Sequence, residues 1–248
     1  EAVAASPKAI TDKIDRAYAA AQKDASEPNV FELASALIAA GEYQESAKYF
    51  RFGISRYPKS ARLRVGLGVA LHGAGDYEAA LQSLCAGADL DPKDTRALFF
   101  LGKMYDLSPP LAGEVTRRLE RYAIAYPDNA AAQHHYAMSY WKSRNGQETE
   151  EDLALIDRHL TRASALDKRS AEIYLNLGAL RERQGRTMDA VRQFELAAAF
   201  APWNPTAWYR LSQALSKTGQ SSRAGQAMDT YRRLREEKQK QAGAQTAK

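Results

Sequence analysis

The amino-acid sequence predicts an all-α fold: a right-handed α-solenoid, or superhelix, of about six helix-turn-helix units with a capping helix at each end. Three recurring markers predict it. A small residue, preceded by Leu or Tyr, recurs at intervals of 34, 34, 35, 41 and 34 residues, at Ala34, Gly68, Gly102, Ala137, Gly178 and Ser212. Seven residues further on, a glycine stands at Gly41, Gly75, Gly185 and Gly219. A proline closes four of the units, at Pro58, Pro92, Pro127 and Pro202.

The chain is expected to begin with a capping helix over residues 6–26. Ile10, Ile14, Ala17 and Ala21 follow a helical period and form a narrow apolar stripe. A stripe of this width is typical of a terminal helix that lies over the first complete unit of a solenoid.

Residues 27–234 are expected to form the six units, each made of two short amphipathic helices. Neither helix of a pair can bury its apolar side alone, so the units must stack. The small residue lets the two helices approach closely, and a bulky replacement would cost about 1–3 kcal/mol. The glycine ends the first helix and the proline prevents the second from continuing. The predicted boundaries are 27–60, 61–94, 95–129, 130–170, 171–204 and 205–234.

After the sixth unit, residues 235–248 are expected to form a charged helical extension that ends in a frayed tail. The preceding segment from Tyr231 to Lys240 carries many charges and few apolar residues, which suits an end that faces water. The last eight residues are polar and rich in alanine, as frayed termini often are.

The repeated unit resembles the tetratricopeptide repeat. That pattern has an aromatic residue, Leu-Gly and Tyr in the first helix, then Ala and Phe four apart in the second, and a closing Pro. Leu177-Gly178, Ala190-x-x-x-Phe194 and Pro202 match it, as does Trp208-x-x-Leu211-Ser212, whereas Arg64 and Arg181 depart from it at single places. The resemblance covers about residues 27–234. It implies a non-catalytic scaffold for protein–protein interaction.

The fourth unit contains an insertion over residues 144–152. Asn145-Gly146 is a turn signal, and Thr149-x-x-Asp152 resembles a capping box that opens the next helix. In solenoids such insertions form loops, some of which lie on the binding face.

The sequence offers little for an enzyme, and we expect no catalytic residue, no metal site and no cofactor. One cysteine excludes a cluster of thiolate ligands, and the four histidines lie on different helices or on different sides of one helix. A net charge of +5, with acidic and basic residues interspersed, argues against a dedicated nucleic-acid binder. No apolar run is long enough to span a membrane. The residues suit a soluble protein, either cytoplasmic or exported to a compartment such as the periplasm after removal of a signal.

The expected working surface is the concave groove lined by the first helices, and the expected ligand is a peptide or protein segment. Groove-facing places recur one step around each first helix from the core-facing ones. The candidate residues are apolar or aromatic anchors flanked by cations: Phe31, Arg62, Val65, Val69, Arg96, Phe99, Lys103, His134, Met138 and Trp141.

In the fourth unit His134, Met138 and Trp141 are expected to form an exposed anchor cluster. The alternative is that Trp141 packs beneath the 144–152 insertion, and the sequence leaves both open. Two other functions also stay open: an assembly factor that oligomerises through its convex face or terminal helix, and an RNA-binding helical repeat.

Overall fold

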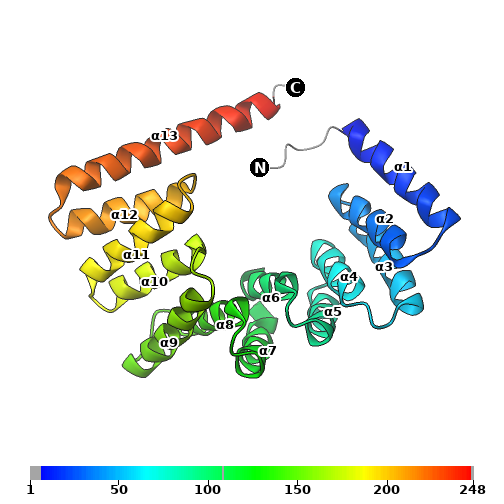
Figure 1. Ribbon diagram of the computed structural model, residues 1–248, viewed down its shortest axis with the longest axis horizontal. Helices are drawn as coiled ribbons and strands as arrows, with labels where there is room; N and C mark the ends of the chain where they lie inside the picture. The colour runs from blue at the N-terminus through cyan, green and yellow to red at the C-terminus, as the bar shows by residue number, and fades with distance from the viewer. Residues whose placement is uncertain (1–6, 108, 247–248) are drawn as a thin grey trace. The chain divides into compact units, whose positions relative to one another are not determined.

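The computed structural model describes residues 7–107 and 109–246, and within them every regular element is helical. Figure 1 shows consecutive helices packed as antiparallel pairs. The chain divides into two compact units, one up to Pro127 and one from Asp128, and each is described by itself. The described residues therefore confirm the predicted all-α fold of helix-turn-helix pairs. The residue at position 6, where the capping helix was expected to start, lies outside them.

The N-terminal unit contains α1 (Pro7–Lys23), α2 (Glu27–Ala39), α3 (Tyr43–Arg56), α4 (Ala61–Gly73), α5 (Tyr77–Leu90), α6 (Thr95–Leu107), the 3-10 turn η1 (Pro109–Leu111) and α7 (Ala112–Ala125). The C-terminal unit contains α8 (Ala130–Ser143), α9 (Glu150–Leu166), α10 (Ala171–Arg183), α11 (Thr187–Phe200), α12 (Pro205–Lys217) and α13 (Ser221–Thr246). The first helices of the six pairs, α2, α4, α6, α8, α10 and α12, begin at the residues where the sequence markers place the start of each repeat.

Helix α1 packs on the first pair through its expected stripe. Ala17 is buried with Leu33 and Leu37, and Ile14 and Ala21 cover the same cluster. Its hydrophobic contacts thus extend the core of the N-terminal unit by one helix.

Small residues and glycines act as the periodicity predicts. A β-carbon on Gly68 would lie 2.6 Å from Cγ of Leu84, and one on Gly178 would overlap the ring of Phe194. Gly41, Gly75, Gly185 and Gly219 end their helices with φ between 73° and 82°, a conformation that glycine adopts without strain. The absence of a side chain at Gly68 and Gly178 therefore allows the helices of these pairs to cross closely.

The insertion is an ordered turn. Helix α8 ends at Ser143, and Asn145 and Gly146 both have positive φ, 50° and 81°. Thr149 and Asp152 exchange side-chain and backbone hydrogen bonds, so the expected capping box is present at the start of α9.

The last helix includes the predicted extension. Helix α13 continues without a break past residue 234 and reaches Thr246, and positions 247–248 of the expected frayed tail lie outside the described residues. In Figure 1 α13 runs beside α12 and extends well beyond it. Alanine, which is frequent in this segment, has the highest helix propensity of the amino acids.

Candidate functional site

In the N-terminal unit the first pair of candidate residues forms a cation–aromatic contact. Phe31 on α2 is partly buried and packs edge-on against the buried ring of Phe50, with ring centroids 5.8 Å apart. The guanidinium carbon of Arg62, on the neighbouring first helix α4, lies 3.6 Å from the centroid of the Phe31 ring. An arginine on an aromatic face is held in place while its outer N–H groups remain available to an acceptor.

A second contact of the same kind lies on α6. Phe99 is 42% exposed and packs edge-on against Phe100 at 5.4 Å, and the ammonium of Lys103 lies 5.3 Å from the Phe99 centroid. Val69 on α4 is half-buried. Phe31, Arg62, Val69, Phe99 and Lys103 are called the N-terminal face below. It combines exposed aromatic surface with two cations.

Val65 does not belong to this face. It is 2% exposed, because its side chain lies against Gly87 of α5, where a β-carbon would come within 2.6 Å of Val65 Cγ2. The expectation that Val65 faces the groove is therefore wrong. Gly87 has no side chain, which leaves room for Val65 inside the crossing of α4 and α5.

Arg96 is exposed but already engaged. Its guanidinium donates hydrogen bonds to both oxygens of the Asp94 carboxylate, with the closest N–O distance 2.6 Å. The side-chain hydrogen bond from Arg96 is the main reason that the pKa of Asp94 is lowered. This pair fixes the turn that leads into α6, so Arg96 is a weaker candidate for ligand contact than Arg62 or Lys103.

In the C-terminal unit His134 is buried rather than part of an exposed cluster. It is 5% exposed, and its Nε2 lies 2.7 Å from the side-chain nitrogen of Asn176 on α10. Burial, with a smaller effect of Lys142, lowers its pKa to about 4. A neutral ring that accepts the amide proton fits both facts. His134 was expected to face the groove, but it is covered because Asn176 of the next first helix, α10, supplies a polar partner for it.

Met138 and Trp141 are half-buried and pack against one apolar cluster that includes Ile156 and Leu177. Trp141 also touches the insertion, since its indole N–H donates to Glu148 at 3.0 Å. The structure thus favours the second of the two expected arrangements, with Trp141 against the 144–152 loop.

The insertion is pinned to α10 through the same carboxylate. Arg183 pairs with Glu148 at 2.6 Å and donates to the carbonyl of Gly146, and the Glu148 side chain is 4% exposed. Burial raises the pKa of Glu148, but its backbone hydrogen bond and Arg183 outweigh burial, so the pKa is lowered. A buried, doubly paired carboxylate therefore holds the loop against the first-helix surface.

Sequence reasoning missed Glu148, Arg183 and Asn176. The sequence predicts the insertion as a loop but not its position. The repeat pattern does not specify the residues at the positions of Asn176 and Arg183 on α10. A signal was present for one of them, because Arg183 follows Glu182 at the end of a first helix and an acidic insertion precedes it by one unit.

The described residues offer little redox or metal chemistry. No group of three or more His, Cys, Asp or Glu side chains converges among them. Cys85 is buried, and burial raises its pKa to about 11, so its thiol is protonated at neutral pH. No helix of the described segments combines the length and apolar character that crossing a bilayer requires.

Comparison with known proteins identifies solved structures with a similar fold. Among solved structures the chain is similar to one titled MamA, with 21% identity and a TM-score of 0.55 over 70% of this chain and 97% of that one. It is also similar to pilF of Pseudomonas aeruginosa, with 14% identity and a TM-score of 0.64 over 92% of this chain and all of that one. A third is YrrB, titled a TPR protein with an unusual peptide-binding site, with 19% identity and a TM-score of 0.52 over 76% and 93% of the two chains.

No curated protein matches the sequence. The solved structures share less than 25% identity with the chain and show the fold alone. The family model for the tetratricopeptide repeat matches residues 31–95 and 175–238, just over half of the sequence. The chain belongs to the tetratricopeptide repeat family.

Proposed function

We propose that this protein is a non-catalytic scaffold that binds a peptide or protein segment on the N-terminal face. The observation that carries the proposal is the pairing of aromatic rings with cations on successive first helices: Arg62 over the partly buried Phe31 and Lys103 beside the exposed Phe99. Aromatic residues and arginine supply most binding hot spots in protein interfaces.

The chemistry of this face indicates the ligand. Phe99 and Val69 offer apolar surface to an aliphatic or aromatic side chain, while Arg62 and Lys103 offer donors to a carboxylate. Neither cation forms an ion pair with a described residue in this structure, unlike Arg96. We therefore infer a ligand segment in which apolar residues alternate with acidic ones. YrrB, a relative in fold, is titled as having a peptide-binding site, which is compatible with this use of the architecture.

Selection of random peptides on the immobilised chain tests the proposal. We expect enrichment of peptides that combine apolar and acidic residues. Phe99→Ala and Arg62→Ala should each weaken the selected peptides by at least about fivefold, the effect of losing about 1 kcal/mol.

Ile124→Ala is the matched control. Ile124 is 71% exposed and lies on α7, a second helix, so its removal should leave affinity unchanged. Unchanged affinity in both Phe99→Ala and Arg62→Ala, or equal loss in Ile124→Ala, would contradict the assignment of this face.

A further inference from the structure

The last helix pair leaves open a face whose counterpart on the preceding pair is covered. Inside the C-terminal unit, Val191, Phe194 and Ala197 of α11 share one core cluster with residues of α12 and are at most 3% exposed. One repeat later, 34 residues on, the same places on α13 hold Gly225, Met228 and Tyr231. Gly225 is exposed, and Met228 and Tyr231 are only half-buried.

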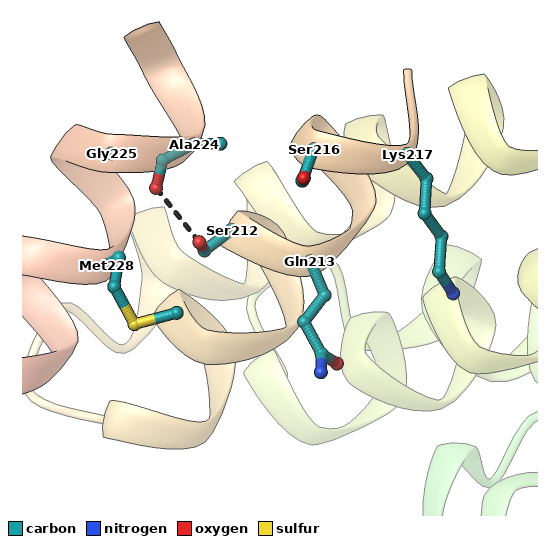
Figure 2. Close-up of a pocket in the computed structure, with 7 residues that line it drawn as sticks. All are labelled: Ser212, Gln213, Ser216, Lys217, Ala224, Gly225 and Met228. Atoms are coloured by element: carbon teal, nitrogen blue, oxygen red, sulfur yellow. Dashed lines mark hydrogen bonds between the residues drawn. The ribbon is translucent and has the colours of Figure 1, made fainter. Parts of the chain in front are cut away.

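Two hollows mark this end face. One of about 440 Å³ lies between α12 and α13 and is lined by Gln213, Ser216, Gly225 and Met228, as Figure 2 shows. The other, of about 480 Å³, lies along the same pair and is lined by Thr206, Tyr209, Tyr231 and Arg235. Tyr209 and Tyr231, which line the second hollow, have ring centroids 5.1 Å apart. The face therefore carries two hollows, one of them walled by a pair of aromatic rings.

Gly225 is a glycine for which the chain itself shows no need. A β-carbon there would meet no atom within 4 Å, and its φ is not positive, whereas Gly68 and Gly178 are required by their neighbours. Glycine inside a helix destabilises that helix relative to alanine. Its place corresponds to the buried Val191 of the internal junction, so Gly225 gives the end face room for a closely approaching backbone.

The charges of the end face differ from those of the junction before it. There, Glu182 of α10 receives Arg210 and Lys217 of the incoming helix, both at 2.8 Å. Ser216 replaces Glu182 on the end face. Arg235 and Lys238 line the second hollow, no Asp or Glu lines either hollow, and neither cation has an ion pair among the described residues. An incoming helix would therefore meet cations instead of a carboxylate.

We propose that the end face of α12 and α13 is a second docking site, distinct from the N-terminal face, for an acidic amphipathic helix of another protein. The bound helix lies as α12 lies on α10 and α11. Its first turns are then beside Arg235 and Lys238, where acidic residues also suit the positive end of a helix dipole. Small residues along its inner stripe fit against Gly225, and its apolar residues cover Met228 and Tyr231.

The probe is a synthetic helical peptide of about 20 residues, long enough to hold helical structure in water. One version carries glutamates in its first turns and an alanine–leucine stripe, and the other carries lysines in place of the glutamates. Fluorescence anisotropy on the full chain should show binding of the glutamate version only. That affinity should fall as salt rises.

Two variants test the face and one controls for it. Arg235→Glu with Lys238→Glu, and separately Gly225→Leu, should each weaken binding about tenfold or more. A side chain at position 225 meets no atom of the chain at its β-carbon, so the second variant retains the fold, which circular dichroism checks. Arg233→Glu reverses one charge on the opposite side of α13, beside Glu237, and should leave affinity unchanged.

Two results with the peptides would overturn the proposal: equal binding of the lysine version, or binding that Gly225→Leu leaves intact. Two results without peptide binding would also overturn it. In one, the wild-type chain self-associates and Gly225→Leu abolishes the association; in the other, the chain binds a single-stranded RNA in place of the acidic peptide. Phe99→Ala should not affect the end face. Failure here is thus distinguishable from failure of the proposed N-terminal site.

Discussion

Trp141 donates its indole N–H to the buried carboxylate of Glu148, and the second oxygen of that carboxylate pairs with Arg183. The three residues come from α8, the insertion and α10. Glu148, a residue of the insertion, therefore holds the loop against the first helices α8 and α10. The indole N–H of Trp141, which an exposed groove would offer to a ligand, is here bonded within the chain.

Removal of Glu148 should destabilise the C-terminal unit. Glu148→Ala leaves a half-buried indole N–H without its acceptor and removes the carboxylate that pairs with Arg183, which we expect to cost about 1–3 kcal/mol. Glu148→Gln keeps an acceptor for Trp141 and should cost less. Thermal melting of both variants checks this order. Gln147→Ala, at an exposed neighbouring position of the same loop, should melt with the wild type.

The same contact gives a pH dependence. The pKa of Glu148 in the folded chain is lowered, so its contribution is fully present above its unfolded pKa of about 4.3 and is lost as the pH falls through the folded pKa. In acid, Glu148→Gln and the wild type should therefore converge in stability. A difference that stays constant from pH 7 to pH 3 would contradict this account.

His134 should make the chain less stable at mildly acidic pH. Its pKa in the fold is about 4, below the unfolded value of about 6.5, so the unfolded chain takes up a proton first. Stability is then full above pH 6.5 and falls as the pH drops toward 4, by an upper bound of roughly 3 kcal/mol.

The measurement for His134 is urea unfolding at pH 7 and pH 5. His134→Gln keeps a polar partner for Asn176 without titrating, so its stability should change less between the two values. His72, whose pKa burial also lowers, acts in the same direction in both chains, so the comparison isolates His134. Equal losses in both chains would contradict the prediction.

The repeat markers predicted the fold because each reports a local requirement. Gly178 and the closing Pro202 have roles that depend only on their own unit, so a regular spacing was enough to predict the helix pairs. The faces of individual side chains were harder to predict. Val65 is buried because Gly87 opposite has no side chain, and His134 because Asn176 approaches it. Those partners lie 22 and 42 residues away, and the helical period does not encode them.

The reasons for the departures from the repeat pattern are likewise visible only in the structure. Arg181 stands where the pattern has Tyr, and its guanidinium forms two bonds, of 2.5 and 2.7 Å, to Asp157 on α9. The sequence shows that this position lacks the tyrosine, but not that the arginine found there binds the carboxylate of Asp157. Likewise, no sequence marker distinguished Gly225 from the glycines that the crossings require.

Two glycine substitutions should therefore have opposite effects on stability. Gly178→Ala places a β-carbon against the Phe194 ring and should cost about 1–3 kcal/mol. Gly225→Ala meets no atom of the chain and should stabilise α13 by up to about 1 kcal/mol. Chemical unfolding of the two variants beside the wild type checks both signs. A destabilised Gly225→Ala would mean that the chain itself needs this glycine.

Finally, Phe99→Ala and Trp141→Ala should separate binding from stability. Both were expected to anchor a ligand, but Phe99 is 42% exposed whereas Trp141 packs on the core and bonds to Glu148. Phe99→Ala should lower peptide affinity by more than about 1 kcal/mol and leave the melting temperature nearly unchanged. Trp141→Ala should lower the melting temperature, since it removes packed surface and leaves Glu148 without one donor. Calorimetric titration and thermal melting of both variants provide the comparison. If Trp141→Ala lost affinity but kept its melting temperature, the indole would be a ligand anchor and the loop contact incidental.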